Sequence, residues 1–570
     1  MTDFTLLLAS VLFASQPATP PDDPLSPLEE PSEPIEAPSP ALSPTPAPVV
    51  SVPRDWPGVF AAIRSQQWAS VQAGIAALPA SPLTALAKAE LYTAKGSPAV
   101  TAQEVAALLA QAPELPQGEQ LQRLALARGV TAPPSIPRRA ALVPIGSTPR
   151  RGRAAAVTGD PQADLLRSEL DPFVKADDAI GAEALLNERG PLLTLEARAE
   201  LGQRVAWIHY VLGRDAEARR VADFWRQGAA GPWAMQAEWV AGLASWRMND
   251  CNAAAQAFRE VGQRSTEPSL AAAGFYWAAR AEMACRRPVT VQPLLRAAAL
   301  SQETFYGLLA RRSLGMETRL APLDLRAADR LSALPNVARA RALVAIGERD
   351  MAGNLLRHQA RIGAPADQSG LVVIAKQLEL PATQHFLGHF GQPGARVVPA
   401  ARYPRPGWRP LNGWQIDPAL GLAHALQESS FRTEAVSQAG AVGLMQVLPT
   451  TRDLIARTRG LPTGNLKDPA INMAFGQEWI RWMRTHSATG GQLPKIIASY
   501  NAGPLPVGRW TDGGRGDPLL WIESMPYWET RFYVPAVLRN LWVYQSFDNA
   551  PTPTLTELAQ HRWPSFPGPR

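Results

Sequence analysis

Cysteine is scarce in this chain, since only two of its 570 residues are cysteines. Two cysteines exclude a fold held together by a disulfide framework, so stability must come from the packing of apolar side chains. Hydrophobic residues make up 46% of the sequence, and a chain of this length predicts at least two domains. Cys251 and Cys285 are either a disulfide pair in an oxidising compartment or two thiols on neighbouring helices.

The signatures of metal and cofactor enzymes are also missing. The seven histidines are scattered, without an HExxH pattern or a Cys/His cluster at metal-ligand spacing. Neither a Walker loop nor a dinucleotide-binding glycine fingerprint is present. The net charge of +6 lacks the clustered basic stripe of a nucleic-acid-binding protein. We therefore expect no metal, no cofactor and no nucleic-acid partner, and the basic excess favours anionic partners.

Apolar runs of transmembrane length are absent. The run from Phe4 to Ala14, followed by small residues, fits the hydrophobic segment and cleavage region of a secretory signal, although Asp3 precedes it and no lysine or arginine does. We expect a signal peptide at residues 1–16, export to the periplasm, and a soluble mature chain without an integral membrane segment.

Residues 17–53 are dominated by proline, serine, alanine and acidic side chains. This composition cannot bury enough apolar surface to fold, and it favours extended polyproline II. We interpret the segment as a disordered tether, and a plain spacer is favoured over a recognition site for a partner.

Strand-like alternation is absent between Trp56 and about Gly388, where apolar residues recur with helical spacing. Three segments share the order aromatic helix, polar turn, second helix, and their turn positions Gly213, Asn249 and Cys285 lie 36 residues apart. A helical-hairpin repeat predicts a solenoid, because each hairpin buries its apolar stripe against the next. The expected fold is therefore all-α, with a helical-repeat superhelix at residues 54–322.

A proline-rich break at residues 396–410 precedes a C-terminal domain of about 150 residues. Asp417 and Pro418 predict a helix start, with the aspartate as N-cap and the proline in the first turn. That helix carries Glu428 near its C-terminal end. A carboxyl group at the edge of an apolar helix face is partly desolvated, which raises its pKa and suits a general acid. From local sequence alone, the alternative is a surface glutamate on an ordinary helix.

Four sequence blocks decide between these two interpretations of Glu428. In order they are QESSF at 427–431, SQAGAVGLMQVLP at 437–449, SYNAGP at 499–504 and ESMPYWETRFYV at 523–534. Together they resemble the soluble lytic transglycosylases, whose catalytic module has a goose-type lysozyme fold. TFYGLLARRSLG at 304–315 and YPRPGW at 403–408 look like the helical ring and linker of the same family. The resemblance implies a ring-like superhelix, a helical linker domain at 323–396, a lysozyme-like domain at 397–552 and a tail at 553–570.

The resemblance also implies roles for residues of the four blocks. Glu428 matches the single catalytic acid and base of the family. The polar residues that match substrate-binding positions in the cleft are Ser437, Gln446, Tyr500, Asn501 and Glu529. Alternatives stay open for two of them, since Asn501 is as suited to stabilising its turn and Glu529 to pairing with Arg531. His424, one helical turn before Glu428, is interpreted as an ordinary helix residue and is left out of the expected site.

The reaction follows from the resemblance, and a lone catalytic carboxyl is consistent with it. Most glycosidases use two carboxylates, whereas the next two acids after Glu428 in sequence, Glu434 and Asp453, occupy no position that the family pattern marks. The N-acetyl group of muramic acid can replace the missing nucleophile. Glu428 is then expected to protonate the glycosidic oxygen between N-acetylmuramic acid and N-acetylglucosamine and next to deprotonate the 6-hydroxyl, which closes onto the anomeric carbon. The expected product is a 1,6-anhydromuramoyl end.

Two other functions are kept as alternatives. One is a muramidase on the same fold, in which water replaces the 6-hydroxyl. The other is an inactive helical scaffold that only binds glycan. The expected partners are peptidoglycan glycan strands, and other cell-wall remodelling proteins are left open as further partners.

Overall fold

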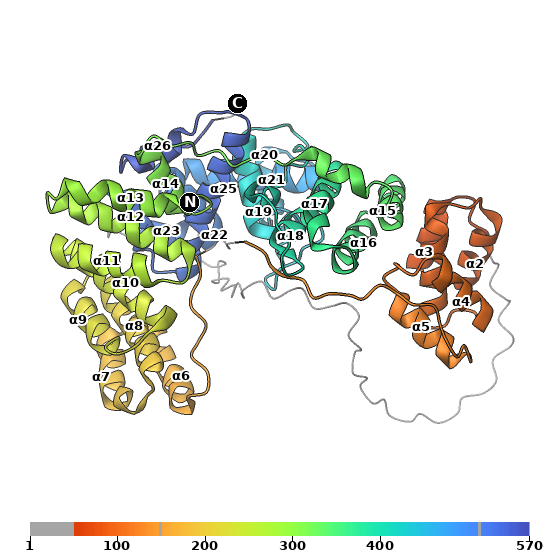
Figure 1. The fold of residues 1–570 in the computed structure, drawn as a ribbon. Coiled ribbons are helices and arrows are strands. Elements are labelled where there is room, and N and C mark those ends of the chain that lie inside the picture. Colours follow the sequence, from red (N-terminus) through yellow and green to blue (C-terminus); the bar gives the residue numbers. More distant parts are fainter. Residues whose placement is uncertain (1–50, 147–150, 511–514, 569–570) are drawn as a thin grey trace, which may run out of the picture. The chain divides into compact units, whose positions relative to one another are not determined.

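The computed structural model describes residues 51–146, 151–510 and 515–568, and regular structure in these ranges is almost entirely helical (Figure 1). The exceptions are the two-residue strands β1 (Val143–Pro144) and β2 (Phe390–Gly391), which pair antiparallel. The predicted all-α fold is confirmed. The expected signal peptide at 1–16 and almost all of the expected tether at 17–53 lie outside the described residues.

The described chain packs into two compact units, and each is built from segments that are far apart in the sequence. One unit contains residues 151–321 and 407–568, and the other contains residues 51–146 and 322–406. We call them the catalytic unit and the companion unit. This grouping differs from the consecutive segments expected at 54–322 and 323–396, because the helices after residue 322 share their core with the helices before residue 128.

The companion unit buries leucine, valine and alanine side chains from both of its segments in one core. Its helices, with the short 3₁₀ turns η3 and η4, are α1 (Trp56–Arg64), α2 (Trp68–Ala77), α3 (Pro82–Thr93), α4 (Ala102–Gln111), α5 (Gly118–Ala127), η3 (Leu325–Leu331), α15 (Pro335–Ala345), α16 (Arg349–Ile362), η4 (Pro365–Asp367), α17 (Gln368–Gln377) and α18 (Pro381–His389).

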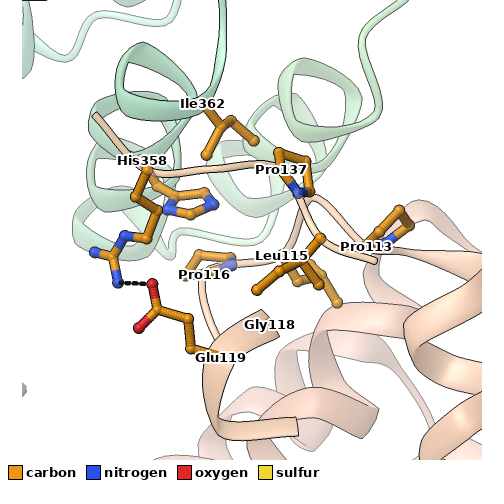
Figure 2. A pocket seen from close by; sticks show the side chains of 10 residues that line it. Pro113, Leu115, Pro116, Gly118, Glu119, Pro137, His358 and Ile362 are labelled. Carbon is orange, nitrogen blue, oxygen red and sulfur yellow. Dashed lines mark ion pairs between the residues drawn. The ribbon is translucent and has the colours of Figure 1, made fainter. Parts of the chain in front are cut away.

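A small pocket lies where the α4–α5 connection meets α16 (Figure 2). His358 lines it, and His358 Nε2 lies 3.0 Å from the carbonyl oxygen of Glu114. The free space of about 10 Å³ is near the size needed for one water molecule, which excludes a glycan site there.

The first segment of the catalytic unit consists of stacked helical hairpins. They are formed by α6 (Pro161–Lys175) and α7 (Ala179–Arg189), α8 (Leu195–Val211) and α9 (Asp215–Trp225), α10 (Gly231–Arg247) and α11 (Cys251–Arg264), and α12 (Pro268–Ala284) and α13 (Val291–Ala299), followed by α14 (Phe305–Ser313). Each hairpin turns at a residue with positive φ, at Asp177, Gly213, Asn249 and Arg286. The predicted turns at 213 and 249 are correct. The third is at Arg286, one residue beyond the predicted Cys285, which is the C-cap of α12.

The two cysteines form a disulfide that joins the first residue of α11 to the end of α12, with their Cα atoms 5.5 Å apart. This decides between the alternatives that the sequence left open. The neighbouring hairpins also share an aromatic core, since Trp277 packs against both Trp239 and Phe258. The repeat is therefore held by apolar packing and by one covalent link.

The second segment of the catalytic unit, which we call the lysozyme-like segment after the sequence prediction, has helices as its regular elements. It contains α19 (Pro418–Ser429), α20 (Pro449–Arg459), α21 (Pro469–Thr485), α22 (Leu493–Ala502), α23 (Pro504–Arg509), α24 (Pro518–Glu523), α25 (Trp528–Phe547) and α26 (Pro553–Ala559). The long helix α25 packs against both α19 and α22. Residues 553–559, expected as part of a tail, form α26, which packs on α14 and buries Leu555 and Leu558. None of the described helices is long and apolar enough to cross a membrane.

A buried ion pair connects the hairpin segment to the lysozyme-like segment. Both carboxylate oxygens of Glu523 accept hydrogen bonds of 2.8 Å from Arg151, and the Tyr306 hydroxyl donates to the same carboxylate at 2.7 Å. Breaking one partner of a buried pair leaves an uncompensated charge, so these contacts specify how the two segments pack.

Candidate active site

Glu428 lies in the last turn of α19. The helix begins as predicted, because the Asp417 carboxylate accepts a hydrogen bond from the Ala419 amide at 2.9 Å and Pro418 occupies the first turn. It ends abruptly, since Ser430 and Phe431 adopt φ values of +52° and +65°. Left-handed backbone at two successive non-glycine residues is unfavourable and is common at functional sites. The sharp ending leaves the Glu428 side chain half-buried at the helix end.

Two residues that the sequence prediction did not include are connected to the Glu428 carboxyl group, one directly and one through the other. The Tyr533 hydroxyl, from α25, donates a hydrogen bond to Glu428 Oε1. His424 Nδ1, from the preceding turn of α19, lies 2.9 Å from the same tyrosine oxygen. Burial raises the pKa of Glu428, the hydrogen bond from Tyr533 lowers it and the negative charge of Glu529 raises it, and together these effects bring the pKa to about 8. The expected rise in pKa is therefore present, and the carboxyl group holds its proton at neutral pH.

The GLMQ block forms a tight loop, residues 435–447, beside the end of α19. Ser437 Oγ accepts a hydrogen bond from the Ala441 amide at 2.9 Å, and Gln446 Nε2 donates to the Gly443 carbonyl at 2.8 Å. Ser429, the residue after Glu428, donates from its hydroxyl to the Leu444 carbonyl at 2.8 Å. Ser437 and Gln446 thus stabilise the loop through hydrogen bonds within it, and their contact with substrate stays a prediction.

Asn472, on α21, is the buried anchor of this loop and was not predicted. Its side-chain oxygen accepts from the Met445 amide at 2.7 Å, and its amide nitrogen donates to the carbonyls of Val442 and Leu466 at 2.8 and 2.7 Å. Gly443 permits this approach, since a Cβ there would lie 2.3 Å from the Leu466 oxygen and 2.4 Å from Asn472 Nδ2. Glycine at 443 thus lets the backbone of the loop approach Leu466 and Asn472 closely.

Tyr500, on α22, reaches the site from the opposite side. Its hydroxyl donates to the Met445 carbonyl at 2.6 Å, and its ring centroid lies 4.6 Å from that of His424. The next residue, Asn501, accepts a hydrogen bond from the Thr530 hydroxyl at 2.6 Å. Tyr500 therefore links the GLMQ loop to the face of His424, and the charge of Glu428 acts on its hydroxyl, whose pKa is raised by burial and by that charge.

Glu529 is the second acid of the site. It lies in the first turn of α25, burial raises its pKa to about 7, and a hydrogen bond from Asn501 counteracts part of that rise. The alternative of an ion pair with Arg531 is not seen among the described residues, because the Arg531 guanidinium lies 3.6 Å from the centre of the Trp207 ring. Glu529 is thus a half-buried carboxyl group whose charge acts on Glu428.

The next two acids after Glu428 in sequence, Glu434 and Asp453, are engaged elsewhere. Glu434 pairs with Lys467 at 2.7 Å, and Asp453 pairs with the neighbouring Arg452 at 2.9 Å. Within the described residues, no group of three or more histidine, cysteine, aspartate or glutamate side chains has the geometry of a metal site. The arrangement can therefore hold a proton on Glu428 and release it to a bound base without using either acid.

The segment that carries this site is similar to known proteins. Residues 410–516 match the family model described as the transglycosylase SLT domain. The chain therefore carries a transglycosylase SLT domain, and within that family it is a relative of the soluble lytic murein transglycosylases. It is 33% identical over 145 residues to the soluble lytic murein transglycosylase of Escherichia coli, an alignment that covers 24% of this chain and 22% of that protein.

A second relative is shorter. The endo-type membrane-bound lytic murein transglycosylase A of Klebsiella pneumoniae is 33% identical over 133 residues, which cover 21% of this chain and 66% of that protein. Among solved structures, this chain is similar to an inactive mutant of the lytic transglycosylase Slt from Pseudomonas aeruginosa. The match covers 89% of this chain and 84% of the chain in that structure, with a TM-score of 0.56 and 19% sequence identity. The family model thus matches the lysozyme-like segment, and the likeness of fold covers most of the chain.

Proposed function

We propose that this chain is a lytic transglycosylase that cleaves the β-1,4 bond between N-acetylmuramic acid and N-acetylglucosamine in peptidoglycan. The observation that carries the proposal is the Glu428 carboxyl group, half-buried at the end of α19 and protonated near neutral pH. A proton donor with a pKa near the working pH is what a general acid requires. The SLT domain match and the printed names of the relatives support the same chemistry.

The reaction needs only one protein group for both proton transfers. Glu428 protonates the glycosidic oxygen as the bond to the anomeric carbon breaks, and the N-acetyl group of the muramoyl residue stabilises that carbon. The Glu428 carboxylate then removes the proton of the muramoyl 6-hydroxyl, whose oxygen bonds to the anomeric carbon. The enzyme regains its proton, no water is consumed, and the product has a 1,6-anhydro end.

A specific observation favours keeping a second candidate, a muramidase that uses water. Inverting and retaining glycosidases use two carboxyl groups, and Glu529 is a second half-buried carboxyl group that acts on Glu428. In this alternative Glu529 activates the water that attacks the anomeric carbon. The products differ by one water molecule, so mass spectrometry of muropeptides released from purified cell walls separates the two candidates.

The remaining scaffold alternative predicts binding without cleavage. Loss of turbidity of purified cell walls tests it, with Glu428→Gln as the comparison. We expect the wild-type enzyme to clear the walls and the variant to leave them turbid, whereas equal behaviour of the two proteins would remove Glu428 from the proposed mechanism.

We also propose that the protein works in the periplasm and acts on glycan strands held near the helical hairpins. The disulfide between Cys251 and Cys285 supports an oxidising compartment. Ser437, Gln446, Tyr500, Asn501 and Glu529 are proposed to contact the sugar chain, and other cell-wall remodelling proteins are proposed as partners.

A further inference from the structure

His424 is fully buried one turn before Glu428, and it touches the catalytic carboxyl group only through Tyr533. Its Nδ1 atom lies 2.9 Å from the Tyr533 oxygen, while its Nε2 atom is buried without a hydrogen-bond partner among the described residues. The Tyr533 hydroxyl thus contacts both His424 and Glu428. Because that hydroxyl carries a single hydrogen, it can donate to only one of these two partners.

The direction depends on which ring nitrogen of His424 holds the proton. With the proton on Nδ1, His424 donates to the Tyr533 oxygen, and the tyrosine hydrogen is left to point at Glu428 Oε1. With the proton on Nε2, Nδ1 becomes an acceptor that attracts the tyrosine hydrogen away from Glu428. The first arrangement lets Tyr533 donate to Glu428 Oε1, and it avoids burying an Nε2–H group without an acceptor, because Nε2 has no hydrogen-bond partner among the described residues.

The choice matters for where Glu428 keeps its acidic proton. When Oε1 accepts from Tyr533, the proton must reside on Oε2, the oxygen that Tyr533 does not occupy. When Tyr533 donates to His424 instead, its oxygen accepts the Glu428 proton, which then points into the protein and away from a glycosidic oxygen. General acid catalysis needs the proton aimed at the leaving oxygen.

The surroundings of His424 keep its ring neutral and fixed. Its ring faces Tyr500 from α22 at 4.6 Å between centroids, and Asn540 from α25 donates to the Ala423 carbonyl beside it at 3.3 Å. Burial lowers the pKa of His424 to about 3. A neutral, immobile ring supplies a hydrogen-bond direction, and it takes no part in the proton transfers themselves.

We propose that His424 is a positioning residue that holds its proton on Nδ1, directs the Tyr533 hydroxyl to Glu428 Oε1 and so reserves Oε2 for the reacting proton. The catalytic part of this inference rests on the proposed function, whereas the tautomer does not.

The tautomer is tested first, by nitrogen-15 NMR of the full-length protein labelled at histidine. The His424 signal is assigned by its loss in His424→Leu, and His486→Asn, which changes a histidine outside the site, serves as the control spectrum. We expect a protonated Nδ1 and an unprotonated Nε2. A protonated Nε2 would overturn the inference, whatever reaction the enzyme catalyses.

Kinetics then test the consequence through a double-mutant cycle. We expect His424→Leu and Tyr533→Phe each to lower kcat by about tenfold or more, with little change in KM, and the double variant to be no slower than Tyr533→Phe alone. His424→Asn, whose amide nitrogen reaches the place of Nδ1, should regain most of the lost rate. Multiplicative losses in the double variant, or no recovery in His424→Asn when circular dichroism shows native folding, would assign His424 a purely structural role.

Discussion

The Tyr533 hydroxyl donates a hydrogen bond to Glu428 Oε1, although 105 residues separate the two positions in the sequence. The contact joins the end of α19 to the first turns of α25, the helix that also carries Glu529. Burial raises the pKa of Glu428, and side chains from a distant helix modify it, because Tyr533 lowers this pKa and Glu529 raises it.

The activity should depend on pH through Glu428. The general acid must be protonated at the start, and its pKa is raised to about 8, so kcat/KM should fall as the pH rises through about 8. The Glu529→Gln variant removes a negative charge that raises this pKa, and its fall should lie at lower pH. Glu434→Gln, in which the lost carboxylate pairs with Lys467, is the matched control and should leave the profile unchanged. Identical profiles for all three proteins would disprove the coupling.

Stability should depend on pH through the same carboxyl group. Its pKa is about 8 in the folded state against an ordinary value of 4.5, so its contribution is fully present below pH 4.5 and is lost as the pH rises through 8. Glu428→Gln does not ionise and still accepts from Tyr533. The free energy of unfolding of the variant relative to wild type should therefore increase between pH 5 and pH 9, by on the order of 2–4 kcal/mol.

Urea unfolding at the two pH values measures this difference. A difference that is the same at pH 5 and pH 9 would mean that Glu428 ionises as easily in the folded protein as in the unfolded chain.

Gly440 and Gly443 form a matched pair for testing the packing of the GLMQ loop. Both have φ near +79°, so alanine at either position adopts an unfavourable left-handed conformation that costs about 1–2 kcal/mol. Only at Gly443 would the new methyl group meet the Leu466 carbonyl and Asn472. Gly443→Ala should be less stable than Gly440→Ala by about 1–3 kcal/mol and should also lose activity. Equal unfolding free energies for the two variants would contradict the packing described for Asn472.

The disulfide should stabilise the hairpin repeat. Cys251 and Cys285 are 34 residues apart, and closing a loop of that size lowers the entropy of the unfolded chain, a stabilisation of about 3–4 kcal/mol. Unfolding in guanidinium with and without a reducing agent measures it. The variant with serine at both positions should resemble the reduced wild type, and an unchanged midpoint after reduction would show that the bridge contributes nothing.

Local patterns were sufficient to predict the elements that depend on neighbours in sequence. The Asp417–Pro418 helix start, the hairpin turns at Gly213 and Asn249 and the position of Glu428 all arise from capping, turn and periodicity rules. The turn at Arg286 was misplaced by one residue, because Cys285, the C-cap of α12, keeps a negative φ and only the residue after it adopts a positive φ.

The rest of the site depends on contacts that periodicity does not contain. His424 was dismissed because a histidine on an apolar helix face is usually an ordinary helix residue, and only the arrival of Tyr533 from α25 gives it a partner. Asn472 was missed because its partners lie in a loop about 30 residues earlier in the chain. An asparagine among the apolar residues of α21 could have indicated a buried amide that needs hydrogen-bond partners. The packing of residues 322–406 with 51–146 also required the folded structure, since segment order does not specify which segments share a core.

The most direct test of the account is the mass of the muropeptides that the enzyme releases from purified peptidoglycan. We predict products with 1,6-anhydromuramoyl ends, which are lighter by one water than the corresponding reducing sugars, and we predict that Glu428→Gln releases almost none. Release of reducing ends by the wild-type enzyme would contradict the single-carboxyl mechanism and would assign to Glu529 the activation of water.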